Sequence, residues 1–267
     1  MSVQSLGWGR YSELRPEQLV ELRRQAPVAY VPWGALDWHG SHLPLGASGT
    51  IAEAIAERSA RRTGGVLLPT GWWSAGGRSS PGSLPMPVAH VSAAWDALFA
   101  GLARNEWRVV VIVNGVYHPA HDLALMDAAE DAIRRYNLLV LAVPPLAMVD
   151  EEMLDRGGIW ETSLLTALRP DQVNSDAIGP EPFNPAAHGI LGRDPRGTAS
   201  ASIGTSTITL AVERLSSAVG QLLAEQSSEP LKVLYERRRE RYRALLARYG
   251  NNLDQLSRAW WGEETEK

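Results

Sequence analysis

Three short polar segments of this sequence hold the side chains that could carry out chemistry. They span residues 37–44, 114–121 and 155–163. The candidate catalytic residues in them are Asp37, His39, His118, Asp155, Arg156 and Glu161. A histidine next to a carboxylate can move a proton near neutral pH, and the same pair can bind a divalent metal. Any one of these side chains, taken alone, is more often structural than functional.

Aromatic residues gather around the same segments. The chain has ten tryptophans and only two phenylalanines, which is an unusual ratio. A tryptophan most often fills core space, but several here stand in or beside the polar segments. We therefore expect a pocket with an aromatic rim that could hold a flat or apolar substrate. The candidate substrate-binding residues are Trp38, Ser48, Trp72, Trp73, Tyr117 and Trp160.

Buried strands are expected directly ahead of the first two polar segments. Residues 28–33 form a short apolar run that ends at Gly34, and β-branched residues dominate 108–113 before Asn114. Two more apolar runs, at 66–69 and 138–143, complete the set of expected strands. The spacing of apolar residues predicts helices over 50–62, 91–105, 120–136 and 159–168.

Strands and helices alternate, and the strands are continuous apolar runs. This combination predicts an α/β fold, a three-layer αβα arrangement with a parallel or mixed central sheet. Ligands in such folds bind outside the carboxyl ends of the strands. Three of these ends, 34–46, 70–84 and 114–121, are also the segments richest in polar and aromatic residues. The fold pattern and the residue chemistry therefore indicate the same place.

The second half of the chain carries fewer signals. Residues 176–205 are rich in glycine, proline, alanine and serine, which fits either a flexible linker or an ordered loop near a site or subunit contact. Amphipathic helices are predicted over 207–226 and 231–249. The arginines of the second are interpreted as a solvated face rather than a site for an acidic partner; they are Arg237, Arg238, Arg239, Arg241 and Arg243. We expect one α/β domain over 1–228, with 229–267 as a helical extension packed on it.

Composition excludes several classes of function. The 267 residues carry a net charge of −4, so nothing favours a nucleic acid as partner. The sequence has no cysteine, which excludes disulfides, thiolate metal sites and a cysteine nucleophile. Any metal must therefore bind to His, Asp or Glu. The N-terminus lacks the layout of a signal peptide and no apolar run is long enough to span a membrane, so we expect a cytoplasmic protein with no membrane partner.

The order and spacing of the motifs resemble the creatininase family. That family carries E-x-H-G-x-H-L-P-L-G-T-D after a strand, then P-G-T, a strand ending in N-G-H, a G-G-x-x-E-T-S helix start and an A-L-x-P-x-x-V tail. The matching segments here are His39-Gly40-Ser41-His42-Leu43-Pro44-Leu45-Gly46, Pro81-Gly82-Ser83, Asn114-Gly115, Gly157-Gly158-Ile159-Trp160-Glu161-Thr162-Ser163 and Ala167-Leu168-Arg169-Pro170-Asp171-Gln172-Val173. The resemblance covers roughly residues 28–223 in the correct order and implies a creatininase-like fold.

The departures from the family pattern concern its two metal ions, which activate water to hydrolyse a cyclic amide. The resemblance places Asp37 and His39 on the carboxylate–histidine pair, and it retains Glu161. The bridging aspartate position holds Ser48, and the N-G-H histidine position holds Val116. A hydroxyl is a poor bridge between two cations, and a valine cannot bind metal. We therefore expect the dinuclear site to be lost.

The family's proton shuttle is also changed, because its Glu-His pair corresponds to Asp155-Arg156. An arginine stays protonated at neutral pH and cannot act as a base. His118 stands where creatininase itself has a glutamate. The original hydrolase activity is therefore expected to be lost, although the replacements remain chemically capable.

Three readings of function follow. The favoured one is a small-molecule enzyme that acts on an amide or related C–N bond without metal, in a biosynthetic tailoring step such as cyclisation, dehydration or rearrangement. In it His39 or His118 acts as acid or base, Asp37 or Glu161 orients it, and Arg156 binds a carboxylate or oxyanion. The second is a cyclic-amide hydrolase with one divalent metal, Zn or Mn, on Asp37, His39, His118 and Glu161. The third is a catalytically inactive scaffold or binding subunit.

Beyond a small-molecule substrate, the resemblance implies only copies of the same chain as partners. Creatininase relatives form hexamers, so a homo-oligomer is expected. Composition and spacing do not bear on this point.

Overall fold

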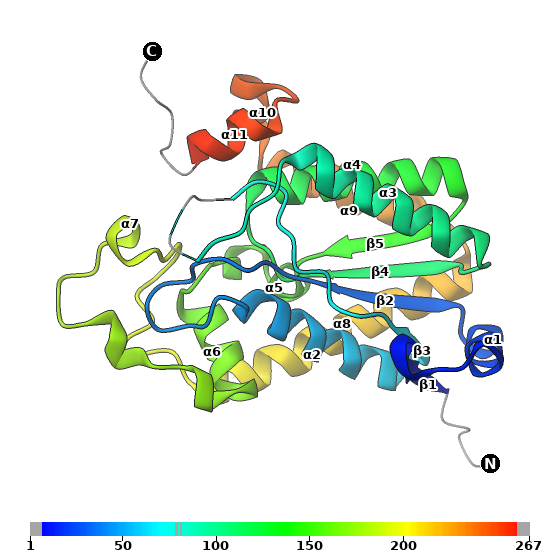
Figure 1. Cartoon of the computed structure of the whole chain (residues 1–267), viewed down its shortest axis with the longest axis horizontal. Coiled ribbons are helices and arrows are strands. Elements are labelled where there is room, and N and C mark those ends of the chain that lie inside the picture. Colours follow the sequence, from blue (N-terminus) through cyan, green and yellow to red (C-terminus); the bar gives the residue numbers. More distant parts are fainter. Residues whose placement is uncertain (1–6, 78–79, 81, 261–267) are drawn as a thin grey trace.

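The computed structural model describes residues 7–77, 80 and 82–260. A five-stranded parallel sheet in the order β1-β3-β2-β4-β5 forms its centre (Figure 1). The strands are β1 (Trp8–Arg10), β2 (Val28–Trp33), β3 (Gly65–Leu67), β4 (Val109–Asn114) and β5 (Leu139–Val143). Every residue of β2, β4 and β5 is buried, which explains why these strands read as unbroken apolar runs.

Helices cover both faces of the sheet, so the predicted three-layer αβα fold is confirmed (Figure 1). One face carries α2 (Ala47–Thr63) and α8 (Ala201–Glu225), and the other carries α3 (Val88–Arg104) and α4 (Pro119–Tyr136). The remaining helices of eight residues or more are α1 (Pro16–Gln25), α6 (Ile159–Leu168), α9 (Glu229–Glu240) and α11 (Leu253–Trp260). Shorter ones are α5 (Pro145–Val149), α7 (Pro185–His188) and α10 (Arg243–Tyr249), with 3-10 turns η1 (Tyr11–Glu13), η2 (Glu151–Met153), η3 (Pro170–Gln172) and η4 (Ser175–Ile178).

The predicted helices and strands of residues 28–168 are confirmed, with ends shifted by a few residues. The edge strand β1 and the helix α1 are absent from the sequence prediction. β1 has only three residues, none fully buried, and α1 buries no residue completely, so neither leaves a strong apolar pattern. α8 begins at Ala201 rather than 207, because Ser200 caps it by accepting a hydrogen bond from the N–H of Ile203.

The helix predicted over 231–249 is divided at residues 241–242 into α9 and α10. The prediction of a solvated arginine face is wrong for Arg238, whose side chain is fully buried and bonded to Asp122 and Glu151. Tyr235, also buried, donates its hydroxyl proton to Val140 O (2.6 Å) and accepts from Ala142 N (3.0 Å) on β5. In the described residues 229–260, this extension therefore packs on the α/β layers; the boundaries 1–228 and 229–267 themselves stay a prediction, since residues 1–6 and 261–267 lie outside the described residues.

No helix among residues 7–77, 80 and 82–260 has the length and apolarity needed to cross a membrane. Of the family-like motifs, Pro81 lies outside the described residues, and the other quoted segments are all described.

Candidate active site

The loops at the carboxyl ends of β2 and β4 bring the first two polar segments together. Gly115, directly after β4, packs so closely on the start of α2 that a Cβ there would lie 2.1 Å from Ser48 O. Only glycine allows this contact, and it fixes the position of the 114–118 turn against the loop after β2. Asn114 then bonds the backbone of Val116 through both atoms of its amide. The turn that carries His118 is therefore held on both sides.

His39 lies between two carboxylates. Its Nδ1 is 2.9 Å from the carbonyl oxygen of Asp37 and 3.1 Å from Asp37 Oδ1, and its Nε2 is 3.4 Å from Glu161 Oε1. Because both neighbours of Nδ1 are acceptors, we assign the ring proton to Nδ1. Nε2 then faces Glu161, whose Oε2 accepts a hydrogen bond from Gly157 N (2.5 Å). The structure thus brings Asp37, His39 and Glu161 into one buried chain of contacts.

Glu161 is buried at the start of α6. Burial raises the pKa of Glu161, while the nearby charge of His39 acts in the opposite direction. A carboxyl whose pKa is raised and which faces an imidazole nitrogen can exchange a proton with it. One proton can therefore move between His39 and Glu161.

Arg156 brings a fixed positive charge to the same chain. Its Nη2 donates to Asp37 Oδ2 (2.7 Å) and to the carbonyl oxygen of Trp38 (2.6 Å), and its side chain is 5% exposed. The backbone of Arg156 pairs with Leu191 through two hydrogen bonds of 2.8 Å. The glycine-rich segment 176–205 is therefore an ordered loop at the site, the second of the two interpretations of its sequence.

Asp155 holds the start of α6. Its Oδ2 accepts from Trp160 N (2.8 Å) and its Oδ1 from Glu161 N (2.9 Å), which satisfies two N–H groups that the helix leaves without a partner. Burial, followed by the negative charge of Glu161, raises the pKa of Asp155 to about 8. These contacts give Asp155 a structural role at the start of α6, and its catalytic role stays a prediction.

His118 reaches the site from the N-terminus of α4. Its Nδ1 accepts from His121 N (3.3 Å), and its Nε2 is 3.2 Å from Ser257 Oγ in α11. Burial, with further contributions from His121 and Arg156, lowers the pKa of His118 well below its usual value. His118 is therefore neutral at physiological pH, and both of its ring nitrogens contact groups of the protein.

A small polar cavity of about 10 Å³ lies among these side chains. Asp37, His39, His118 and Arg156 line it, together with the candidate substrate-binding residues Ser48 and Tyr117. Ser48 also has a structural contact, since its Oγ accepts from Ala35 N (3.0 Å).

The four candidate tryptophans have other surroundings than this cavity. Trp72 packs on the start of α2 at Gly46 and Gly49, and Trp38 packs against Gly189. Trp73 is 40% exposed. The guanidinium of Arg193 lies 6.0 Å from the ring of Trp160. In the part of the chain that the structure describes, none of the four lines the cavity.

Two residues near the site, His42 and Ser257, were not singled out from the sequence as functional. His42 Nε2 is 2.9 Å from Thr162 Oγ1, and burial lowers the pKa of His42 to about 4. His42 lies in the same sequence motif as His39, and this position could have identified it as a residue of the site. Ser257 lies 139 residues after His118 in the sequence, and no local sequence pattern predicts their contact.

The residues present do not fit the metal site that the resemblance implies. The guanidinium of Arg156 already donates a hydrogen bond to Asp37 Oδ2, so this oxygen faces a positively charged side chain instead of a metal ion. Both ring nitrogens of His118 contact other groups of the protein. Val116 offers no donor and Ser48 offers a hydroxyl that already accepts from Ala35. Among the described residues, no group of three or more His, Asp or Glu side chains could hold a metal ion.

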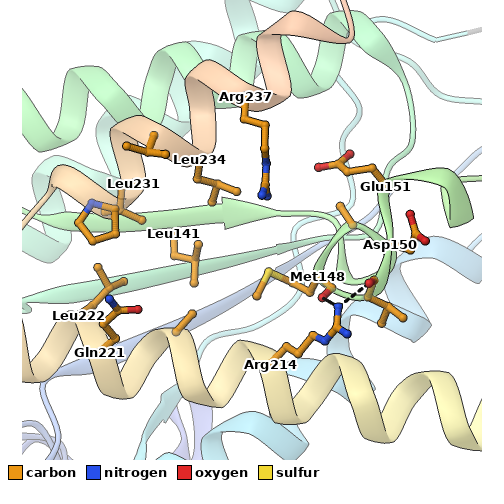
Figure 2. Close-up of a pocket in the computed structure, with 15 residues that line it drawn as sticks. Leu141, Met148, Asp150, Glu151, Arg214, Gln221, Leu222, Leu231, Leu234 and Arg237 are labelled. Carbon is orange, nitrogen blue, oxygen red and sulfur yellow. Dashed lines mark hydrogen bonds between the residues drawn. The ribbon is translucent and has the colours of Figure 1, made fainter.

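A larger groove of about 600 Å³ lies apart from these residues, between α8, α9 and the segment α5–η2 (Figure 2). Figure 2 shows an apolar floor that includes Leu141 and Leu222, and Arg214, which donates to the carbonyl oxygens of Met148 and Val149. None of the candidate catalytic residues lines this groove. Size alone would favour it as the active site, but the small cavity has the side chains that can do chemistry.

Comparison with known proteins bears on this site. The family model described as creatininase, creatinine amidohydrolase, matches residues 12–219. Creatinine amidohydrolase of Pseudomonas putida is 28% identical over 180 residues, which cover 58% of this chain and 69% of that protein. Mycofactocin precursor peptide peptidase of Mycolicibacterium smegmatis is 30% identical over 167 residues, covering 59% of this chain and 64% of that protein.

Solved creatininase structures share the fold. A crystal structure of creatinine amidohydrolase (creatininase) has a TM-score of 0.69 at 23% identity and covers 82% of this chain and 98% of its own. A structure titled "Creatininase Mn" also has a TM-score of 0.69 at 23% identity, with coverages of 79% and 97%. A creatininase mutant of "Zn-Zn type" gives the same values, so relatives of this fold have been solved with zinc and with manganese.

Proposed function

This chain belongs to the creatininase family of amidohydrolase-fold enzymes, and on that premise we propose that it catalyses a metal-independent acid–base step on an amide-type substrate. The observation that carries the proposal is His39, held between Asp37 and Glu161 with Arg156 bonded to the same aspartate. It is the arrangement of a general acid–base group, with one carboxylate to orient it and one to exchange its proton.

In the proposed mechanism, Asp37 keeps the Nδ1 proton of His39 in place and so leaves Nε2 for proton transfer. Glu161 supplies or receives the proton at Nε2. Its raised pKa favours the protonated carboxyl, which can donate, and loss of that proton leaves a base. The two residues together can therefore remove a proton from one atom of a substrate and return it to another.

Arg156 is proposed to stabilise negative charge on the substrate. Its guanidinium is fixed by Asp37 and Trp38 and does not need to reorganise during the reaction. A carboxylate or the developing oxyanion of an amide carbonyl beside it would gain from this positive charge. His118, neutral and buried, is proposed as a wall of the site that donates its Nε2 proton rather than as the base.

The substrate class is proposed from chemistry and relatives together. Relatives are a creatinine amidohydrolase and a peptidase of a precursor peptide, whose names both describe C–N bonds of amides. The second relative supports a biosynthetic tailoring step, such as a cyclisation, dehydration or rearrangement of an amide-containing compound. Proton transfer without a metal-bound water suits these reactions better than hydrolysis.

The test is a screen of cyclic amides and short peptides with chelator-treated enzyme, with products followed by mass spectrometry. For the substrate found, His39→Ala should abolish turnover and Glu161→Gln should lower it by about 10²-fold or more. His90→Ala, at an exposed histidine, is the matched control and should keep full activity. Full activity of His39→Ala would disprove the mechanism.

Metal analysis of the purified protein, before and after incubation with Zn or Mn, tests whether the protein binds a metal ion. We expect well below one ion per chain. One equivalent that is lost in His118→Ala would support the mononuclear cyclic-amide hydrolase instead. Two equivalents would show that the ligands have been assigned wrongly, and absence of turnover with every compound would favour a scaffold.

We also propose, from the family resemblance, that the protein is a cytoplasmic homo-oligomer, with a hexamer expected. Light scattering coupled to size-exclusion chromatography measures this directly. A monomer at micromolar concentration would contradict it.

A further inference from the structure

The helix α11 lies outside the stretch 12–219 that matches the family, yet it reaches the candidate active site. It packs along α4, the helix that carries His118 at its N-terminus (Figure 1). Leu256 and Ser257 are its buried residues, at 0% and 3% exposure. Residues from the C-terminal extension are therefore part of the surroundings of the site.

Ser257 connects α11 to two walls of the cavity. Its Oγ accepts from Gly77 N (3.1 Å) and lies 3.2 Å from His118 Nε2. Because His118 Nδ1 accepts from His121 N, its ring proton is on Nε2, and His118 donates to Ser257. A Cβ at Gly76, whose φ is +74°, would lie 2.6 Å from Ser257 Oγ, so glycine is what allows segment 74–77 to come this close.

A second contact holds the other end of the same helix turn. Asp254 Oδ1 accepts from Val88 N (3.2 Å), the first residue of α3. The side chains of α11 thus accept hydrogen bonds from two backbone N–H groups, those of Gly77 and Val88. Both contacts are between elements that lie far apart in the sequence, and both can break without disrupting the sheet.

The cavity behind these contacts is too small for any organic substrate. A volume of about 10 Å³ is close to the minimum that holds one water molecule. His39 is 3% exposed and Asp37 is 7% exposed. If the proposed chemistry occurs at His39, one wall of the cavity has to move to admit the substrate.

The elements around the cavity differ in how firmly they are attached, and α11 lies behind the wall, where Ser257 contacts the wall residues Gly77 and His118. The ends of β2 and β4, and the starts of α4 and α6, belong to the buried core. α11 follows α10, which has no fully buried residue, and a turn at Gly250 with φ of +54°. Elements with few buried contacts open locally at a lower free energy than the core.

We propose that α11 is a lid over the active site and that Ser257 is its latch. In the closed state Ser257 holds His118 and Gly77, and the site is sealed from water. In the open state α11 releases Gly77 and Val88, the wall at Gly77 moves, and substrate reaches His39. The lid proposal depends on the proposed function in one respect, which is that a substrate binds at His39.

The absence of cysteine from the whole sequence allows a direct test with a single introduced thiol. Ser257→Cys reports on the latch, Ser217→Cys on the exposed face of α8 serves as the open control, and Ser59→Cys, at 0% exposure in α2, serves as the core control. Each variant is treated with Ellman's reagent under native conditions. We expect Ser257→Cys to react roughly 10- to 10³-fold more slowly than Ser217→Cys, and at least about 100-fold faster than Ser59→Cys.

The two limiting results both overturn the proposal. A latch thiol that reacts as slowly as the core control would show that α11 opens only when the whole protein unfolds. One that reacts as fast as the surface control would show that α11 does not close the site in solution. Adding Asp254→Ala to Ser257→Cys should accelerate the reaction severalfold, while Asp254→Ala should leave the rate of Ser59→Cys unchanged.

Hydrogen exchange in the unmodified protein gives a second measurement that needs no variant. The amides of Gly77 and Val88 donate to side chains of α11, whereas that of Gly115 donates to Trp33 O. We expect the first two amides to exchange at similar rates, at least about 100-fold faster than Gly115. Equal protection of all three would overturn the lid. Neither readout uses a substrate, so failure of the proposed chemistry and failure of the lid are distinguishable.

Discussion

Two buried clusters of charge meet at the first turn of α4, and they are built differently. The first is the candidate active site, with Asp37, His39, Arg156 and Glu161. The second, which we call the Arg238 cluster, contains Asp122, Glu151, Arg238 and Tyr242. His118 at the start of α4 faces the first cluster, and Asp122, four residues later, faces the second.

In the Arg238 cluster, one arginine contacts both carboxylates directly. Arg238 contacts Asp122 Oδ2 at 2.5 Å and Glu151 Oε1 at 2.6 Å, and Tyr242 donates to the same Asp122 oxygen at 2.8 Å. In the candidate active site, by contrast, burial and then the nearby negative charge of Glu161 raise the pKa of Asp155. Burial alone therefore does not separate the two clusters. What distinguishes the site is that its groups are held in an electrostatically costly arrangement.

The largest expected effect is on the Arg238 cluster. Arg238→Met should lower the free energy of unfolding by about 3–5 kcal/mol, because it leaves the charge of Asp122 buried without its cation. Arg237→Met, on the exposed face of the same helix, is the control and should change little. Urea denaturation measures both, and equal small effects would mean that the cluster does not anchor α9.

The next effect is the pH dependence of stability at the active site. The pKa of Asp155 in the folded protein, about 8, is above the value of an unfolded aspartate, so the folded state favours the protonated form. Stability from this group is complete below about pH 4 and is lost as the pH rises towards 8. We expect the free energy of unfolding to fall by a few kcal/mol over this range, at about 1.4 kcal/mol for each unit by which the pKa is raised. Urea titrations at several pH values test it, and a rise in stability would contradict the assignment.

Removal of the charge at Glu161 should have a smaller effect on the free energy of unfolding, and it should increase stability. Glu161→Gln keeps an acceptor for Gly157 N but removes the charge that raises the pKa of Asp155. We expect a gain in stability of about 1 kcal/mol at pH 8 together with the loss of turnover described above. A loss of stability would show that Glu161 has a structural role, like the residues of the Arg238 cluster.

The smallest expected effect on stability is that of an exposed ion pair, which serves as a reference for the buried ones. Arg243 and Glu240 form an ion pair on the surface of the C-terminal extension, with exposures of 76% and 59%. Arg243→Ala should leave the midpoint of urea denaturation unchanged within error, because exposed pairs contribute little. A clear shift would show that exposure is a poor guide to the energetic role of these arginines.

These two clusters also show what a sequence can and cannot reveal. Asp37, His39 and Glu161 were identifiable because they stand at strand and helix ends that apolar patterns locate. Arg238 was assigned to a solvated face because its neighbours in sequence are charged, and its burial depends on Asp122 and Glu151, 116 and 87 residues away. Ser257 lacks even a local signal. Local pattern predicts elements and the residues at their ends, whereas contacts between distant elements depend on packing that the pattern does not encode.

Tyr235 has a consequence for how copies of this protein can associate. β5 is an outer strand of the sheet, and unpaired N–H and C=O groups along such a strand invite another chain to add to it. The hydroxyl of Tyr235 satisfies Val140 O and Ala142 N, as a neighbouring strand would. The sheet is thereby terminated, and self-association cannot proceed by extending it across β5 into a continuous ribbon or fibril. Copies of this chain that associate at this edge must do so through helices and loops.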